Sequence, residues 1–255
     1  MSIQRAIRTG FVAIDQAEGA GARVRSPFLL LDHFTIGSGA GFPDHPHRGQ
    51  ETITYLLSGG VDHEDFAGHK GTIGPGDLQF MTAVPGIMHA EMPHENPDGS
   101  PNVGMQLWVD LPEKLKMCGP LYRDLRAAEI PVADVHDGKV SVKVISRQSH
   151  GDSVRDLAYI PVWIFDITLG RSITFHNVVF DQAGDFVQAS NVAEAKQDSR
   201  FTLIASQPLN QKIVQYGFVL NSQEQVQQAM MDFRNNSNGF ERAKGWRSEI
   251  GKRMG

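Results

Sequence analysis

Residues 51–66 read ETITYLLSGGVDHEDF, and this stretch indicates the fold. Residues 51–57 are rich in β-branched and aromatic side chains, as strands are, and residues 58–60 (Ser-Gly-Gly) are a hairpin signal. Residues 61–66 are then the return strand. Short strands separated by glycine and proline turns continue on both sides, from residue 24 to residue 110. Strands of this length, with turns about every 8–12 residues, are typical of a double-sheet jelly roll.

The chain has a second β-rich half. Residues 111–137, which contain Pro112, Pro120 and Pro131, are interpreted as a strand-poor connection. The β pattern resumes after residue 138, with predicted strands over 140–145, 159–168, 172–176, 201–205 and 213–216; a further short strand is expected over residues 7–15. We therefore predict an all-β chain of two β-sandwich units, residues 1–135 and 136–255.

One helix is predicted near the C-terminus. Asn221 is a suitable N-cap, and Glu224, three residues later, is its partner in a capping box. Apolar side chains follow at helical spacing: Val226, Ala229, Met230 and Phe233. This stripe indicates core packing.

Composition excludes several classes of protein. Hydrophobic content is 40% and charged content 21%, which is ordinary for a globular protein. A net charge of −5 argues against a protein that holds nucleic acid by neutralising phosphates. No apolar run approaches the length of a membrane span, and the first residues lack the apolar core of a secretory signal. Cys118 is the single cysteine, which suits a reducing compartment. We expect a cytoplasmic protein, or a nuclear one if the source is a eukaryote.

Two short histidine motifs are the candidate functional site. His45-Pro-His47 and His89-Ala-Glu91 lie in predicted strands, where alternate side chains point the same way. Either pair alone is a weak signal in a chain with ten histidines, since such pairs arise by chance. Context strengthens it, because seven of the ten lie within residues 33–94: His33, His45, His47, His63, His69, His89 and His94. Two such pairs on facing strands present three imidazoles and a carboxylate to one point. This ligand set suits a mononuclear transition metal with open positions.

Several motifs resemble the pirin family of the cupin superfamily. They are residues 45–52 (HPHRGQET), 71–77 (GTIGPGD), 86–93 (GIMHAEMP) and the C-terminal 213–221 (IVQYGFVLN). The resemblance covers most of the chain and implies two tandem cupin domains with a short C-terminal helix. It also implies one metal ion in the N-terminal cupin domain. That ion is most often Fe(II), while Mn, Co, Ni, Cu or Zn is also compatible with the ligands.

By motif match, the family's metal ligands fall on His45, His47, His89 and Glu91. Glu51 is the competing carboxylate, because it stands at the usual cupin ligand position and would share the face of His47. The resemblance favours Glu91 as ligand and leaves Glu51 to orient a ligand. Gln50 is a departure, since pirins commonly carry an aromatic residue there. Between residues 175 and 201 the chain is shorter than is usual for the family, so we expect a reduced or irregular C-terminal cupin.

The resemblance implies two classes of function. Some pirins are quercetin 2,3-dioxygenases, so this chain is expected to bind a small aromatic substrate such as a flavonol, together with dioxygen. Glu91 would then accept the proton of the 3-hydroxyl group. The alternative is a metal- or redox-dependent regulatory protein that binds partner proteins, as a transcription cofactor does. We expect a monomer that does not contact nucleic acid or membrane directly.

Other side chains near the motifs are weaker candidates. The flanking apolar residues are candidate pocket walls, although alternation sends some of them to the core: Phe42, Phe80, Met81 and Met88. Arg48 is interpreted as one half of a structural ion pair. The remaining histidines, His33, His63, His69 and His94, are candidates to line the mouth of the pocket, although a surface or turn role is favoured for each.

Overall fold

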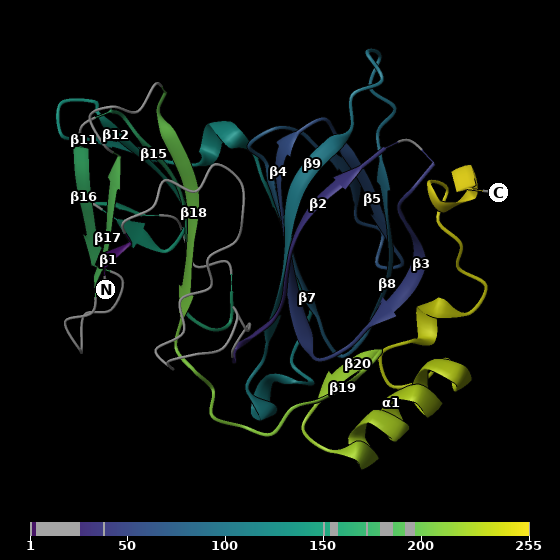
Figure 1. Cartoon of the computed structure of the whole chain (residues 1–255). Coiled ribbons are helices and arrows are strands. Elements are labelled where there is room, and N and C mark those ends of the chain that lie inside the picture. The colour runs from purple at the N-terminus through teal and green to yellow at the C-terminus, as the bar shows by residue number, and fades with distance from the viewer. Residues whose placement is uncertain are drawn as a thin grey trace. The chain divides into compact units, whose positions relative to one another are not determined.

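The computed structural model describes residues 2–3, 26–37, 39–149, 151–153, 158–171, 173–178, 186–191 and 197–254. These residues form two compact units. The larger unit is Val24–Ala127 with Pro208–Gly255, and the smaller unit is Met1–Arg23 with Ala128–Gln207. Most strands lie in antiparallel sheets (Figure 1), so the all-β prediction is confirmed. None of the described helices is long and apolar enough to cross a membrane.

Two sheets face each other in the larger unit. The five-stranded sheet has the order β10 (Leu121–Leu125), β7 (Leu78–Ala83), β4 (Gln50–Ser58), β9 (Asn102–Asp110), β2 (Phe28–Ile36). The four-stranded sheet has the order β3 (Phe42–His47), β8 (Ile87–Pro93), β5 (Val61–Asp65), β6 (Lys70–Ile73). We call the side chains that point from one sheet toward the other the inter-sheet layer. The functional residues discussed below lie in it.

Strand alternation decides which side chains of β4 enter the inter-sheet layer. Thr54 donates a hydrogen bond to Glu91 of β8, which belongs to the opposite sheet. Because successive side chains of a strand point to opposite faces, Gln50 and Thr52 share the face of Thr54. Glu51 and Ile53 therefore point to the other face. Residues 50–56 are buried on both faces, which explains why the strand is so rich in β-branched and aromatic side chains.

A tight turn joins the two sheets between β3 and β4. Gly49 has φ +82°, a left-handed conformation that glycine adopts without strain. A Cβ atom there would overlap the carbonyl oxygen of Val219. The backbone N–H of Val219 donates to the carbonyl of Arg48 at 3.0 Å. Glycine is thus required where the chain leaves the histidine strand.

The C-terminal part of the chain completes the larger unit. It contains the hairpin β19 (Val214–Tyr216) and β20 (Phe218–Leu220), followed by helix α1 (Gln223–Asn235). The helix was predicted, but its start is one residue later than expected. Ser222 is the N-cap, and its capping-box partner is Gln225, whose side chain accepts from the Ser222 backbone N–H at 3.0 Å. Asn221 and Ser222 are both good capping residues, so the sequence pattern alone did not separate them.

One face of α1 packs onto the turn after the histidine strand. Val226 and Ala229 are buried as predicted, whereas Met230 is 39% exposed. Asp232 is buried in its place, because its carboxylate pairs with Arg48 at 2.7 Å. Arg48 also donates to the carbonyl of Pro85 and lies over the ring of Phe240. The predicted structural role of Arg48 thus agrees with its contacts.

The smaller unit contains a four-stranded sheet and a three-stranded sheet. The first has the order β11 (Val132–Val135), β12 (Val140–Ser146), β15 (Val162–Leu169), β18 (Ser199–Ser206). The second has the order β1 (Ser2–Ile3), β17 (Phe186–Asn191), β16 (Ile173–Val178). A short hairpin joins β13 (Gln148–Ser149) and β14 (Asp152–Ser153). Four 3₁₀ helices complete the described elements of the chain: Glu113–Leu115, Ala127–Glu129, Glu241–Ala243 and Gly251–Met254.

Residues 111–137 are not the strand-poor connection that was predicted. They contain β10, which pairs with β7 in the larger unit, and β11, which pairs with β12 in the smaller unit. The compact units follow packing rather than chain order, since α1 packs with the N-terminal sandwich. The predicted division into residues 1–135 and 136–255 stays a prediction. The strand expected over residues 7–15 and much of the segment expected to be shortened, between residues 175 and 201, lie outside the described residues.

Candidate metal centre

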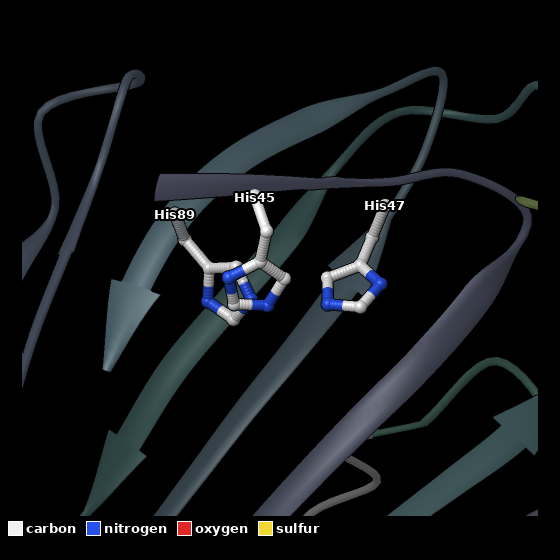
Figure 2. A group of neighbouring side chains, drawn as sticks. All are labelled: His45, His47 and His89. Atoms are coloured by element: carbon white, nitrogen blue, oxygen red, sulfur yellow. The ribbon is translucent and has the colours of Figure 1, made fainter. Parts of the chain in front are cut away.

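Strands β3 and β8 bring the two histidine motifs together. They pair antiparallel, with His45 directly opposite His89, and a bulge lies between Phe42 and His45. Since His45 and His47 are two residues apart, both imidazoles enter the inter-sheet layer beside His89. Figure 2 shows the three rings grouped together. Their candidate ligand nitrogens all lie within 4.8 Å of one another.

The three imidazole rings contact one another without stacking. Ring centroids are 4.3 Å apart for His45 and His89, 4.7 Å for His45 and His47, and 4.9 Å for His47 and His89. The rings are tilted or edge-on, with interplanar angles of 51–83°. This arrangement leaves ring nitrogens facing a common point, as binding of a single ion requires.

Hydrogen bonds decide which nitrogens are available. Nδ1 of His45 lies 2.8 Å from the carbonyl oxygen of Pro43 and donates its proton to it, which leaves Nε2 as the candidate ligand nitrogen. Nε2 of His89 is buried and has no hydrogen-bond partner among the described residues. A buried nitrogen without a partner is rare, and a metal ion would satisfy it.

Burial keeps two of the histidines neutral. Desolvation, with a smaller effect of neighbouring His45, lowers the pKa of His47 to about 3. Desolvation also holds the pKa of His89 well below its usual value, with His45, His47 and His63 adding to the effect. A metal-binding imidazole must be unprotonated. The residues present therefore fit a divalent transition metal.

Glu91 lies next to this group but is not part of it. Its carboxylate is not within 4.8 Å of all three histidine nitrogens. It lies on β8 two residues from His89, so it enters the same inter-sheet layer. Thr54 donates to its Oε1 at 3.1 Å, and the Thr54 hydroxyl also contacts Gln106 at 2.6 Å. Burial raises the pKa of Glu91, against the opposing effects of His45 and Thr54.

Glu51, the competing carboxylate, points away from the histidines. The chain turns at Gly49 and continues in the opposite sheet, so Glu51 does not share the face of His47. On β4 it lies on the face opposite to Gln50 and Thr54, and it accepts from Thr82 at 3.2 Å. Geometry thus favours Glu91 over Glu51 as the carboxylate of this site.

The flanking apolar residues divide between the site and the core. Met81 lines a small cavity together with His89. Phe42 is 52% exposed, with its ring 6.3 Å from that of His45. Phe80 and Met88 point to the opposite faces of their strands, because their neighbours Met81 and His89 enter the inter-sheet layer.

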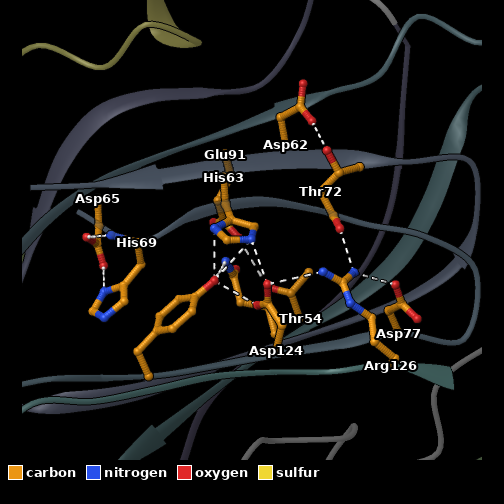
Figure 3. Close-up of polar contacts among 12 residues, drawn as sticks. Thr54, Asp62, His63, Asp65, His69, Thr72, Asp77, Glu91, Asp124 and Arg126 are labelled. Carbon is orange, nitrogen blue, oxygen red and sulfur yellow. Dashed lines mark hydrogen bonds and ion pairs between the residues drawn. The ribbon is translucent and has the colours of Figure 1, made fainter. Parts of the chain in front are cut away.

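A second, partly buried polar cluster lies beside the histidines and was not predicted. We call it the His63 cluster; it consists of His63, Tyr122 and Asp124, and Figure 3 labels His63 and Asp124. His63 is 3% exposed rather than a surface residue, and its Nε2 donates to Asp124 at 3.1 Å. The Tyr122 hydroxyl donates to the other Asp124 oxygen at 2.7 Å. Although burial opposes it, these two hydrogen bonds hold the pKa of Asp124 below its usual range.

The His63 cluster shares a cavity with the candidate metal centre. This cavity is narrow, with no room for a water molecule, and it is lined in part by His63, His89 and Tyr122. The cluster was missed because Tyr122 and Asp124 stand on β10, in the segment that was interpreted as a connection. Tyr122 and Asp124 are two residues apart in the sequence. This spacing could have predicted that both side chains lie on the same face of a strand. His69 and His94 are partly exposed and pair with Asp65 and Asp62, consistent with the surface roles predicted for them.

Known proteins resemble this chain along almost its whole length. The family described as Pirin matches residues 10–109, and the Pirin C-terminal cupin domain matches residues 168–239. Pirin of Homo sapiens is 40% identical over 296 aligned positions, covering 98% of this chain and all of the relative. Pirin-like protein 2 of Arabidopsis thaliana is 39% identical, covering 92% of this chain and 85% of the relative.

Solved structures show the same fold. A crystal structure of quercetin 2,3-dioxygenase from Acinetobacter baumannii is 27% identical, with a TM-score of 0.69 and coverage of 83% of this chain and 85% of that one. A protein from Geobacillus kaustophilus is 29% identical, with a TM-score of 0.59 and coverage of 72% and 84%. The predicted pair of cupin domains is confirmed by the family matches. From the identity with relatives across nearly its full length, the chain belongs to the pirin family.

Proposed function

We propose that this chain is a mononuclear, non-haem, metal-dependent dioxygenase that opens the ring of a flavonol such as quercetin. The observation that carries the proposal is the convergence of His45, His47 and His89, two of them kept neutral by burial. The likeness to a quercetin 2,3-dioxygenase of known structure supports the reaction type.

In this proposal His45, His47 and His89 hold the metal through three neutral nitrogens, and Glu91 is the fourth ligand. When bound there, Fe(II), or Mn, Co, Ni, Cu or Zn in its place, supplies Lewis-acid polarisation and, for a redox-active ion, reaction with dioxygen. Glu91 lies two residues from His89 on β8 and enters the same inter-sheet layer as the three histidines. The Pro43 carbonyl fixes the ring of His45 for this role.

Glu91 is also the proposed proton acceptor. A buried carboxylate with a raised pKa accepts a proton from an acidic substrate hydroxyl more readily than an exposed one. Thr54 holds Oε1 of Glu91 in place, and Gln106 in turn orients the Thr54 hydroxyl. The buried surroundings keep bulk water from competing for that proton.

The test is turnover of quercetin by protein loaded anaerobically with Fe(II), Mn(II), Co(II), Ni(II) or Cu(II). We expect oxygen-dependent release of carbon monoxide and a ring-opened product from at least one form. Glu91→Gln should abolish turnover while metal remains bound, whereas His94→Ala, a change at a 41%-exposed side chain, should not affect it. Absence of product from every metal form would rule out this substrate class.

A second candidate function is a metal-dependent regulatory protein that binds protein partners. The C-terminal segment contacts the residues on either side of the His45–His47 pair. Ser248 donates to Asp44, which precedes the pair, and Asp232 forms an ion pair with Arg48, which follows it. Oxidation of a bound Fe(II) adds one unit of charge beside these contacts. In this second proposal the added charge alters the surface to which a partner protein binds. That surface includes Met231 of α1, whose side chain is 48% exposed.

Comparing the proteins captured by metal-loaded wild type with those captured by His45→Ala and His89→Ala tests this second function. We expect different partner sets if it is correct, and identical sets would contradict it. The monomeric state and the cytoplasmic or nuclear location stay predictions from the sequence.

A further inference from the structure

Three buried polar atoms that have no hydrogen-bond partner among the described residues belong to His89 and to two residues that contact His47. They are Nε2 of His89, Oε1 of Gln50 and Nε1 of Trp108. The first is accounted for by a metal ion. The other two come from the five-stranded sheet, which faces the histidines across the inter-sheet layer. They are not explained by metal binding alone.

Gln50 and Trp108 contact the same imidazole. The Gln50 amide nitrogen lies 3.3 Å from Nδ1 of His47, and the Trp108 ring is edge-on to His47 with centroids 5.2 Å apart. Gln50 is 1% exposed. The two residues stand on neighbouring strands, since Gln50 of β4 pairs with Asp110 of β9, two residues after Trp108. Both side chains therefore enter the inter-sheet layer beside His47.

Metal binding fixes the orientation of the Gln50 amide. If His47 binds an ion through Nε2, its Nδ1 carries the proton and must donate it. The Gln50 amide then presents Oε1 to Nδ1, a 180° rotation that exchanges its oxygen and nitrogen. After this rotation the NH₂ group occupies the buried position without a partner. Two N–H donors, from Gln50 and Trp108, then lie beside His47 with no acceptor among the described residues.

We propose that Gln50 and Trp108 form an oxyanion subsite beside His47, which donates hydrogen bonds to a negatively charged ligand oxygen. A carboxylate, enolate or phenolate oxygen can accept from both donors at once, whereas an apolar ligand leaves both unsatisfied. This inference rests on the proposed function in one respect, the binding of metal by the histidines. It adds that the substrate is bound as an anion and names the residues that hold its oxygen.

The test uses Zn(II)-loaded, ¹⁵N-labelled protein and sodium formate as the probe. Zn(II) is diamagnetic, and the chain has three tryptophans, so three indole N–H signals are expected. The signal lost in Trp108→Phe should shift when formate is added, and the other two should not. The Kd for formate should rise about tenfold in Trp108→Phe, as expected for a lost hydrogen bond to a charged group.

Trp163→Phe is the matched control, because Trp163 packs against the core of the smaller unit. It should leave the Kd for formate unchanged. Gln50→Met keeps the length of the side chain and removes the amide, and it should also weaken formate binding. Zinc affinity is measured for each variant, since Gln50 contacts a proposed ligand. Circular dichroism confirms that each variant folds.

A second arm compares 3-hydroxyflavone with flavone, which lacks the acidic hydroxyl. Only 3-hydroxyflavone should lose affinity in Trp108→Phe, if the oxygen bound is that of a flavonol. Loss for formate alone assigns the subsite to small carboxylates instead.

The two proposals fail in different ways. Quercetin turnover with no response of Trp108 to either probe overturns the subsite and leaves the dioxygenase intact. A shift of the Trp108 signal with formate, but no turnover with any metal, leaves the subsite and removes the dioxygenase. Protein that takes up no zinc overturns both.

Discussion

The larger and the smaller unit are both built from β-sheets, but their buried side chains differ in kind. In the smaller unit the core is apolar, and its centre consists of Val140, Val142, Val144, Phe165, Ile167 and Leu169. In the larger unit the inter-sheet layer holds buried His47, Gln50, His89 and Glu91. Burying polar groups costs free energy unless they are satisfied. Their concentration around the three histidines supports the proposal that the larger unit carries the metal site, while the apolar cluster of the smaller unit contributes to stability.

The largest effect is expected in the apolar core of the smaller unit. Phe165→Ala removes a fully buried ring and should lower the free energy of unfolding by about 3–5 kcal/mol. Metal stoichiometry at the histidines should stay the same in the fraction that remains folded. Chemical denaturation followed by circular dichroism, with metal analysis of the same sample, measures both quantities. Loss of metal from folded variant protein would contradict the division of roles.

In the larger unit, removing a histidine should affect binding more than folding. His89→Ala deletes one of the three converging ligands. Replacing a residue that only hydrogen-bonds to a metal ligand already lowers metal affinity by about 10–100-fold, so losing a ligand should lower it by more than about 100-fold. Stability of the metal-free protein should not decrease, because the buried nitrogen without a partner is removed. Calorimetric titration with Zn(II) or Co(II) tests this, with His94→Ala as the exposed control. Unchanged affinity would mean that the ion binds elsewhere.

The neutral histidines predict a pH dependence of the metal-free protein. His47 takes up a proton near pH 6.5 when unfolded but only near pH 3 when folded. The unfolded state therefore holds more protons between these values, and stability falls as the pH is lowered through this window. The slope contributed by His47 approaches about 1.4 kcal/mol per pH unit. Denaturant titrations at a series of pH values between 6.5 and 4.5 measure it.

His47→Asn should reduce that slope, and His94→Asn should not. Glu91 contributes the opposite sign, because its raised pKa makes the folded state hold the extra proton. The comparison is therefore repeated in a Glu91→Gln background, where the slope should be steeper. An identical slope with and without His47 would contradict the neutral state proposed for it.

The smallest effect is expected from the residue that orients Glu91. Thr54→Val keeps the shape of the side chain and removes the hydroxyl that donates to Oε1. Metal affinity or quercetin turnover should fall about tenfold. This is the lower end of the loss expected when a residue that hydrogen-bonds to a metal ligand is replaced. Thr72→Val, on β6 at the opposite end of the sheet order from β3, is the matched control. Equal losses in both variants would show that Thr54 has no specific role.

The sequence predicted the parts of the fold that depend on local pattern. Alternation in His45-Pro-His47 and His89-Ala-Glu91 correctly indicated that each pair shares a face. The same rule failed for Glu51, because it assumed one continuous strand where the chain turns at Gly49 and changes sheet. Strand β10 was missed because Pro120 precedes it and polar residues interrupt it. Its pairing with β7 is a long-range contact that local pattern does not encode.

The sequence alone also could not predict which residues pair with buried charged side chains. Arg48 was expected to form an ion pair, but nothing local identified Asp232 on a helix 184 positions away. Likewise, the amide of Gln50 and the indole of Trp108 meet at His47 only once both sheets are assembled. Such contacts follow from tertiary packing rather than from spacing.

The contacts that the C-terminal segment makes with Asp44 and Arg48, on either side of the histidine pair, have a consequence for biosynthesis. Asp44 accepts hydrogen bonds from Ser248, and the carboxylate that pairs with Arg48 is that of Asp232. During translation the strand that carries His45 and His47 leaves the ribosome long before those partners exist. Its final anchoring must wait until Asp232 and Ser248 have been synthesised, so we expect the ion to be loaded after residue 248 has left the ribosome rather than before.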